Sequence, residues 1–118
     1  MNRNAIKLLG VLITSFFIVA CNPVAPTTTV KVYKAQGSIS CDPGSGTSLT
    51  AMSGILNKSG IAVRSAHCGS DGLVRAAVCG VSTGKLNVYE IDASDLNSVI
   101  RMGFKKVELL KDYKPGSC

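Results

Sequence analysis

Four cysteines are spread along the chain after residue 40 and constrain its fold more than any other feature. They stand at positions 41, 68, 79 and 118, so that 27, 11 and 39 positions separate them. Zinc sites usually contain CxxC-like pairs, and this spacing has none. An even number of widely spaced cysteines instead predicts two disulfides, provided that the protein folds in an oxidising compartment.

The first 20 residues indicate such a compartment, because they have the pattern of an export signal. Arg3 and Lys7 provide a positively charged start, and residues 8–20 form an uncharged run of 13 residues. This run matches the apolar region of a signal peptide and is shorter than the roughly 20 residues that a spanning helix needs. The alternative is an uncleaved, tilted anchor helix that begins near Ala5.

The residues before position 21 resemble a more specific signal. Ile18, Val19 and Ala20 directly precede Cys21, and this order is similar to the lipobox of bacterial lipoproteins. The resemblance covers only residues 1–22. It implies cleavage between Ala20 and Cys21 and attachment of acyl chains to Cys21. Two or more acyl chains give effectively stable membrane attachment, because each buried methylene contributes about 0.8 kcal/mol.

The residues after the cysteine indicate where the protein is held and how. In lipoproteins an Asp at this position commonly retains the protein at the inner membrane, so Asn22 implies the outer membrane, facing the periplasm. Residues 22–29, NPVAPTTT, predict an extended tether, because proline and threonine disfavour a helix. We therefore expect a signal peptide at 1–20, a lipidated N-terminus and tether at 21–29 and one small domain at 30–118.

The charge balance of the mature chain is mildly basic. Two of the 13 Lys and Arg residues lie in the signal, which leaves 11 basic and seven acidic side chains and a net charge of +4. This charge fits either ordinary solubility or an anionic partner such as a glycan carboxylate or a lipid headgroup. An exported, membrane-tethered protein rarely meets nucleic acid, so we expect no nucleic-acid partner.

Hydrophobic patterning predicts an α+β domain. The expected strands cover residues 30–35, 61–68, 75–81, 86–91 and 104–110. A helix capped by Thr47 or Ser48 follows the first strand, and a second helix begins at Asp92 or Ser94. The expected inward residues of the two helices are Leu49, Met52, Ile55 and Leu56, and Leu96, Val99 and Ile100.

The order of these elements predicts a ferredoxin-like fold. Strand, helix, strand, strand pair, helix and strand correspond to the split βαβ plan with an extra hairpin strand near its middle. Its two crossovers should be right-handed and place both helices on one face of a mostly antiparallel sheet. We therefore expect a two-layer sandwich stapled by disulfides.

This topology favours one of the three possible cysteine pairings. Cys68 ends one expected strand and Cys79 lies in the next, so these two can face each other, which leaves Cys41 with Cys118. Pairing of Cys41 with Cys68 is the alternative, because the first two strands end on the same side. Each disulfide is expected to stabilise the fold by about 2–4 kcal/mol.

The same topology makes the first and last strands neighbours and suggests a basic strip. Its members would be Lys31, Lys34, Lys105 and Lys106. The strip either binds an anionic partner or is a solvated set of lysines that protects a sheet edge.

No residue pattern indicates catalysis. His67 is the only histidine, and consecutive strand residues point to opposite faces, which works against a hydrogen bond with Cys68. The glycine-rich residues 44–48 lack the Lys-Ser/Thr pair of a phosphate-binding loop. The acidic residues mostly occupy turns and helix caps. We expect no enzymatic activity, no metal site and no cofactor.

The expected function is therefore binding, by a membrane-anchored accessory that docks on another envelope component. The mature domain is similar in outline to small uncharacterised proteobacterial lipoproteins. One alternative is a peptidoglycan-binding or glycan-binding module, because the outline is similar to that of SPOR domains, although their binding signature is missing. Another alternative is an inhibitor of a host or competitor enzyme, with GSDG at 69–72 as the reactive loop.

Overall fold

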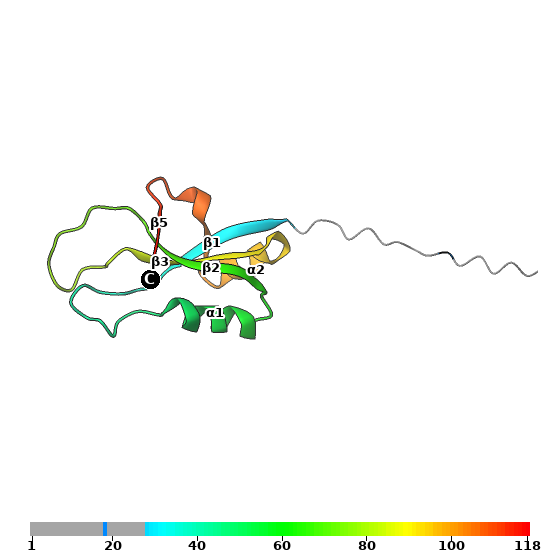
Figure 1. The fold of residues 1–118 in the computed structure, drawn as a ribbon, viewed down its shortest axis with the longest axis horizontal. Coiled ribbons are helices and arrows are strands. Elements are labelled where there is room, and N and C mark those ends of the chain that lie inside the picture. The colour runs from blue at the N-terminus through cyan, green and yellow to red at the C-terminus, as the bar shows by residue number, and fades with distance from the viewer. Residues whose placement is uncertain (1–17, 19–27) are drawn as a thin grey trace, which may run out of the picture.

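The computed structural model describes residue 18 and residues 28–118. It shows an α+β domain in which a five-stranded antiparallel sheet packs against two α-helices (Figure 1). The strands are β1 (Thr29–Ala35), β2 (Val63–Ser70), β3 (Lys85–Asp92), β4 (Lys105–Lys106) and β5 (Lys114–Gly116). The helices are α1 (Leu49–Lys58) and α2 (Leu96–Arg101), together with the short 3-10 helices η1 (Ala93–Asp95) and η2 (Val107–Leu109).

The sheet has the strand order β4-β1-β3-β2-β5, with β3 in the centre. β3 is antiparallel to both of its neighbours, and Val32 of β1 lies opposite Tyr89 of β3. The segment with α1 connects β1 to β2, and the segment with α2 connects β3 to β4. The expected pairing of the first and last strands is confirmed for Lys105 and Lys106, which lie opposite Tyr33 and Val32.

Helix α1 begins and ends at residues with the appropriate local chemistry. The Ser48 hydroxyl accepts a hydrogen bond from the Ala51 amide at 3.1 Å, so Ser48 is the N-cap. Beyond the helix, Gly60 has a φ of 79°, a conformation that favours glycine. Met52 and Leu56 are buried, but Ile55, which we expected to face inward, is 51% exposed because it lies at the edge of the apolar stripe.

The main core lies between the helices and one face of the sheet. Its buried members are Val32, Met52, Leu56, Ile61, Tyr89, Ile91, Val99 and Phe104. The rings of Tyr89 and Phe104 meet edge to face with their centroids 6.0 Å apart. The Tyr89 hydroxyl donates to the Leu49 carbonyl at 2.6 Å, and burial raises the pKa of Tyr89 to about 12. This hydroxyl therefore stays protonated and ties the sheet to α1.

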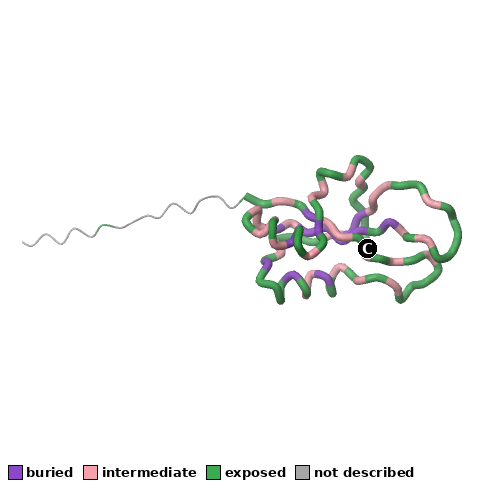
Figure 2. The backbone as a smooth tube through the Cα atoms, turned by 180° about the vertical axis from the view of Figure 1, so that it is seen from behind, coloured by how far each residue is buried: buried purple, intermediate pink, exposed green. Residues whose placement is uncertain are grey.

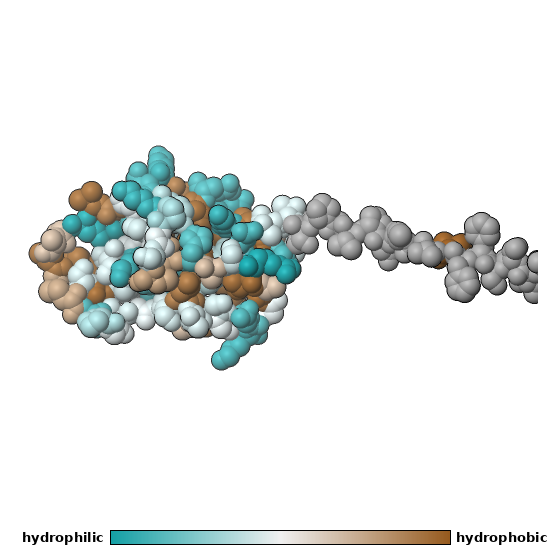
Figure 3. All heavy atoms as spheres, viewed as in Figure 1, coloured by the Kyte–Doolittle hydropathy of each residue, from teal (hydrophilic) through white to brown (hydrophobic). Residues whose placement is uncertain are grey.

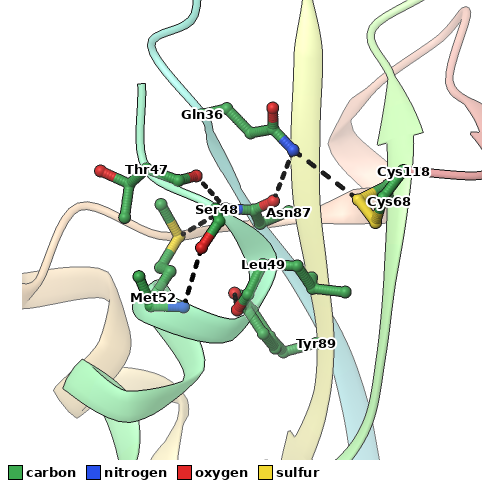
Figure 4. Close-up of a disulfide and its surroundings, with 10 residues drawn as sticks. Gln36, Thr47, Ser48, Leu49, Met52, Cys68, Asn87, Tyr89 and Cys118 are labelled. Carbon is green, nitrogen blue, oxygen red and sulfur yellow. Dashed lines mark hydrogen bonds between the residues drawn. A yellow bond between two sulfur atoms is a disulfide. The ribbon is translucent and has the colours of Figure 1, made fainter. Parts of the chain in front are cut away.

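A buried amide makes a second link between the sheet and α1 (Figure 4). Asn87 of β3 is fully buried, and its Nδ2 donates to the Thr47 carbonyl at 2.9 Å. Its Oδ1 accepts a hydrogen bond of 2.8 Å from Gln36, whose Nε2 also lies 3.7 Å from the Cys68 sulfur. The polar atoms of this buried side chain are thus satisfied, which fixes the start of α1 against the sheet.

The opposite face of the sheet is covered by the C-terminal part of the chain. β4 and β5 lie at opposite edges, so residues 107–113 must pass from one edge to the other. The Tyr113 hydroxyl lies 2.8 Å from His67 Nε2. Leu86 and Val88 are buried, and their register places them on this face, with His67 opposite Val88. The domain therefore has a third, thin layer beyond the two layers that we expected.

The structure corrects two expected strands. Residues 75–81 form no strand but belong to a loop, because β5 occupies the outer edge of β2 that such a strand would need. The expected strand at 104–110 ends after Lys106, where η2 begins. Its sequence lacks a regular alternation beyond Phe104, and the chain has to leave the edge in order to cross the sheet. Figure 2 shows buried positions along the sheet and α1, and mainly exposed or intermediate ones in the loops at one end.

Both disulfides are present, but the expected pairing is wrong. Cys41 is bonded to Cys79 and Cys68 to Cys118, with Cα–Cα distances of 5.2 and 5.1 Å. Neither 68–79 with 41–118 nor the alternative 41–68 occurs. Cys79 lies in a loop that extends beyond the end of the sheet, and β5 places the C-terminal residues along β2, where Gly116 lies opposite Cys68. The error in the strand at 75–81 thus caused the error in the pairing.

We predict that two adjacent substitutions in α1 have very different effects on stability. Leu56→Ala should lower the free energy of unfolding by about 2–5 kcal/mol, because Leu56 is 0% exposed and truncation leaves a cavity. The matched variant Ile55→Ala should change it by less than about 1 kcal/mol. Urea unfolding with the disulfides intact measures both values, and equal losses would contradict the burial of Leu56.

Candidate interaction surface

Two long loops meet at one end of the sheet and form a surface that we call the loop pole, residues 36–48 and 71–84. The disulfide between Cys41 and Cys79 joins them covalently. Backbone hydrogen bonds join them as well: Ser40 donates to the Val81 carbonyl at 2.9 Å, and Gly80 donates to the Ser40 carbonyl at 3.2 Å. Helices and strands are missing from both loops, so these links hold them in place.

The second of these loops, residues 71–84, is also closed at its base, and we call it the clamped loop. The Asp71 amide donates to the Gly84 carbonyl at 3.1 Å. The Arg75 guanidinium forks onto the Asp71 carboxylate, with Nη1–Oδ1 and Nη2–Oδ2 distances of 2.8 and 2.5 Å. Gly84 has a φ of 73°, and a Cβ at this position would lie 2.3 Å from the Arg75 Nη1 atom. Glycine at position 84 therefore makes room for the fork.

The charges of this fork are matched to each other. The hydrogen bond from Arg75 lowers the pKa of Asp71, although partial burial opposes the shift. The hydrogen bond from Asp71 correspondingly raises the pKa of Arg75. Both groups are therefore charged at neutral pH, and they neutralise each other.

The clamped loop presents apolar side chains to solvent. Val74 is 99% exposed, Leu73 58% and Val78 55%, and Ile39 of the neighbouring loop is 40% exposed. Figure 3 shows apolar atoms gathered at this end of the domain. A group of exposed apolar side chains at one end of a domain is a candidate interaction site.

The loop pole lies at the end of the domain opposite Thr29, the first residue of β1 (Figure 1). Thr29 pairs with Asp92 at one end of β3, and the clamped loop joins β3 at Lys85, at the other end. β3 has eight residues, so the two ends are about 23 Å apart at about 3.3 Å per residue. A partner can therefore reach the loop pole without contacting the N-terminal end of the domain.

A hollow of about 320 Å³ opens beside residues 36–45, and Thr83 and Lys85 complete its lining. Its lining includes the hydroxyls of Ser38, Ser40, Ser45 and Thr83, together with Asp42 and Lys85. The sulfur of Cys41, which also lines it, is bonded to Cys79 and is no thiolate. The hollow offers hydrogen-bonding groups beside the apolar side chains of the clamped loop.

The four lysines of the expected strip are near one another in the sheet but divide between its two faces. Successive strand residues alternate, so Lys31 and Lys105 lie on the face opposite the helices. Lys34 lies on the helix face, where its ammonium donates to the Met102 carbonyl at 3.0 Å and stands 5.6 Å from the centre of the Phe104 ring. The four side chains therefore do not form one strip.

Acidic groups lie close to two of the remaining lysines, Lys31 and Lys106. Lys106 pairs with Glu108 at 3.3 Å. Glu90 lies directly opposite Lys31 in the sheet and accepts hydrogen bonds from Thr29 and Ser65. An anionic ligand at this surface would meet carboxylates as well as ammonium groups.

The other residues that the sequence singled out lie elsewhere. Ala20 and Cys21 are outside the described residues. His67 forms a hydrogen bond with Tyr113, and its register places it on the sheet face opposite to that of Cys68. Within the described part of the chain, no three His, Cys, Asp or Glu side chains gather in a possible metal site. In the same part, no helix is both long enough and apolar enough to cross a membrane.

The fork between Asp71 and Arg75 is the feature of this surface that the sequence analysis missed. The two residues stand four positions apart in the sequence, but residues 75–81 were expected to form a strand, and only residues 69–72 were expected to form a loop. A strand would have placed the two side chains on the same face without bringing them together. The exposure of Val74 could not be inferred either, because the pattern alone does not distinguish an apolar residue in a loop from one in a strand.

No protein-family model matches this chain, and no curated protein or solved structure is significantly similar to it. Function is therefore inferred from the chain's own residues and geometry.

We predict that Arg75 controls the ionisation of Asp71. The folded pKa of Asp71 lies below its ordinary value of 3.8, so the pairing stabilises the fold above that value and the stabilisation is lost as the pH falls through the folded pKa. Arg75→Ala should raise the Asp71 midpoint in a carboxyl-carbon NMR titration. The matched variant Arg64→Ala should raise the midpoint of Asp92, its own partner, and leave Asp71 unchanged. If the Asp71 midpoint is the same in Arg75→Ala as in the wild type, the pairing of Arg75 with Asp71 is contradicted.

Proposed function

We propose that this protein is a small envelope lipoprotein that docks on a protein partner through its loop pole. The observation that carries the proposal is the exposed apolar side-chain cluster of the clamped loop at the end of the domain opposite Thr29. Its role is non-enzymatic binding or assembly at a membrane surface. The partner is another component of the envelope.

The sequence before the domain supports the membrane part of this proposal. A charged start, an uncharged run and the order Ile18-Val19-Ala20-Cys21 are the features of a lipoprotein signal. Acyl chains on Cys21 would hold the domain by the tether that leads to Thr29. Asn22 favours the outer membrane and the periplasmic side. In this arrangement the tether holds one end of the domain and the loop pole points away from the anchor.

We also propose that the domain is a ferredoxin-like, split βαβ variant. The strand order β4-β1-β3-β2 and the two crossovers through α1 and α2 support this assignment. β5, at the edge of β2, is an addition to that plan. This addition brings Cys118 to Cys68 and closes the sheet edge.

Docking on a protein has more support than binding of an acidic glycan. Lys31 and Lys105 share a face, but Glu90 lies opposite Lys31, and Lys34 is engaged with Met102 and Phe104. The apolar side chains of the loop pole have no comparable internal partners. An apolar surface of this kind recognises another apolar surface.

We predict that Cys21→Ser abolishes membrane attachment. The variant should lose labelling by radioactive fatty acid and move from the membrane fraction to the soluble fraction, because a serine does not accept the lipid. The matched variant Thr27→Ser in the tether should keep both the label and the membrane location. A Cys21→Ser protein that stays with the membrane at the wild-type level would overturn the lipid anchor.

We predict that position 74 contacts the partner in intact cells. A photoreactive amino acid at Val74 should give a discrete crosslinked adduct after illumination, because this side chain is 99% exposed at the loop pole. The same amino acid at Leu109, which is 68% exposed in η2, is the matched control and should give no such adduct. Adducts of equal yield from both positions, or none from position 74, would contradict docking through the loop pole.

A further inference from the structure

We infer, building on the proposed docking role, that the clamped loop is the reactive segment of a substrate-like inhibitor. Its target is an endopeptidase whose specificity pocket takes a small aliphatic side chain, and Val74 occupies that pocket. The exposed side chains, the open backbone and the fork between Asp71 and Arg75 each support this inference.

The backbone around Val74 is available to a peptide-binding cleft. In the described structure no hydrogen bond is donated by the backbone amides of residues 74–77. None is accepted by the backbone carbonyls of Val74 and Arg75. Residues 73–76 belong to no helix or strand. Clefts that bind extended peptides use main-chain hydrogen bonds for affinity and side-chain pockets for specificity. The segment offers both kinds of contact.

The positions of the Val74 and Arg75 side chains indicate which kind of specificity pocket the target endopeptidase has. Arg75 is half-buried and its guanidinium is held by Asp71, so it cannot enter an acidic specificity pocket without losing that partner. Val74 projects fully into solvent, which makes it the side chain that a cleft would receive. A small aliphatic pocket therefore fits this loop, and a pocket for Arg or Lys does not.

The fork spans the bond that such an enzyme would attack. Asp71 lies on the N-terminal side of the Val74–Arg75 peptide bond, and Arg75 is the first residue on its other side. Hydrolysis would transfer the hydroxyl of water to the Val74 carbonyl carbon and its remaining proton to the Arg75 nitrogen as the C–N bond breaks. The fork, the Asp71–Gly84 hydrogen bond and the disulfide at Cys79 would then hold the two new ends together.

Because these links hold the two chain ends together after cleavage, the loop would act as an inhibitor rather than as an ordinary substrate. Chain ends that stay in place can lose water and reform the peptide bond in the reverse reaction, so cleavage does not release the enzyme. A loop that is already ordered also binds more tightly, because it loses less conformational entropy. The three restraints on the clamped loop thus serve inhibition as well as folding.

The test uses the full-length protein in detergent with two serine endopeptidases of known specificity. Elastase has a small aliphatic pocket and trypsin has an acidic one. The protein should inhibit hydrolysis of a chromogenic peptide by elastase and leave trypsin active. Val74→Asp should raise the inhibition constant for elastase about 100-fold, as expected for an anchor residue. The matched variant Leu109→Asp, on another exposed apolar residue, should inhibit like the wild type.

Two further variants separate this mechanism from general binding. Val74→Arg should transfer inhibition from elastase to trypsin, because the loop then presents a basic anchor. Asp71→Asn should be cut after residue 74 and release active enzyme, because the fork across the bond is weakened. Circular dichroism and the disulfide pattern confirm that each variant is folded.

A folded wild-type protein that leaves elastase fully active, or that elastase digests without delay, would overturn the inference. Either result leaves the proposed docking role intact if position 74 still crosslinks in cells. The partner would then hold the loop in a groove without cleaving peptides.

Discussion

Strand β3 is buried on both faces of the sheet, and the rest of the domain is arranged around this requirement. Tyr89 and Ile91 pack beneath the helices, whereas Leu86 and Val88 are buried on the other face. A strand of this kind needs a partner at each edge and a cover on each side. β1 and β2 supply the edges, and α1, α2 and the C-terminal segment supply the covers. The two ends of β3 then define the two ends of the domain, one at Thr29 and the other at the loop pole.

The loop pole is ordered by a different principle, because its apolar side chains lie in solvent and cannot form a core. The Cys41–Cys79 disulfide and the fork at Asp71 take the place of buried contacts. A disulfide typically contributes about 2–4 kcal/mol, which is a large share of the net stability of a small domain, about 5–15 kcal/mol. Cys41 has a φ of 67°, a region that residues other than glycine seldom adopt. The Cys41–Cys79 bond is formed at this position and links the two loops that carry the exposed apolar residues.

Regular patterns in the sequence predicted the elements that depend on local chemistry. β1 alternates apolar and polar residues, β1 and β3 formed at nearly the expected residues, and α1 begins after Ser48 as its cap chemistry indicated. β5 was missed, because Lys114-Pro115-Gly116 has no strand propensity and pairs only since β2 offers a free edge. Of the interaction surface, the sequence anticipated a loop between cysteines but neither its extent nor the fork that closes it.

The sequence by itself determined the α+β class, the order of the main elements and the presence of two disulfides. It also predicts the lipid on Cys21, which lies outside the described residues. The tertiary structure alone decided which cysteines pair, which lysines share a face and which apolar residues stay in solvent. These outcomes depend on residues far apart in the chain, such as Cys68 and Cys118. Local propensity does not specify which distant segment pairs with a sheet edge, and because β5 pairs with β2, residues 71–84 remain a loop.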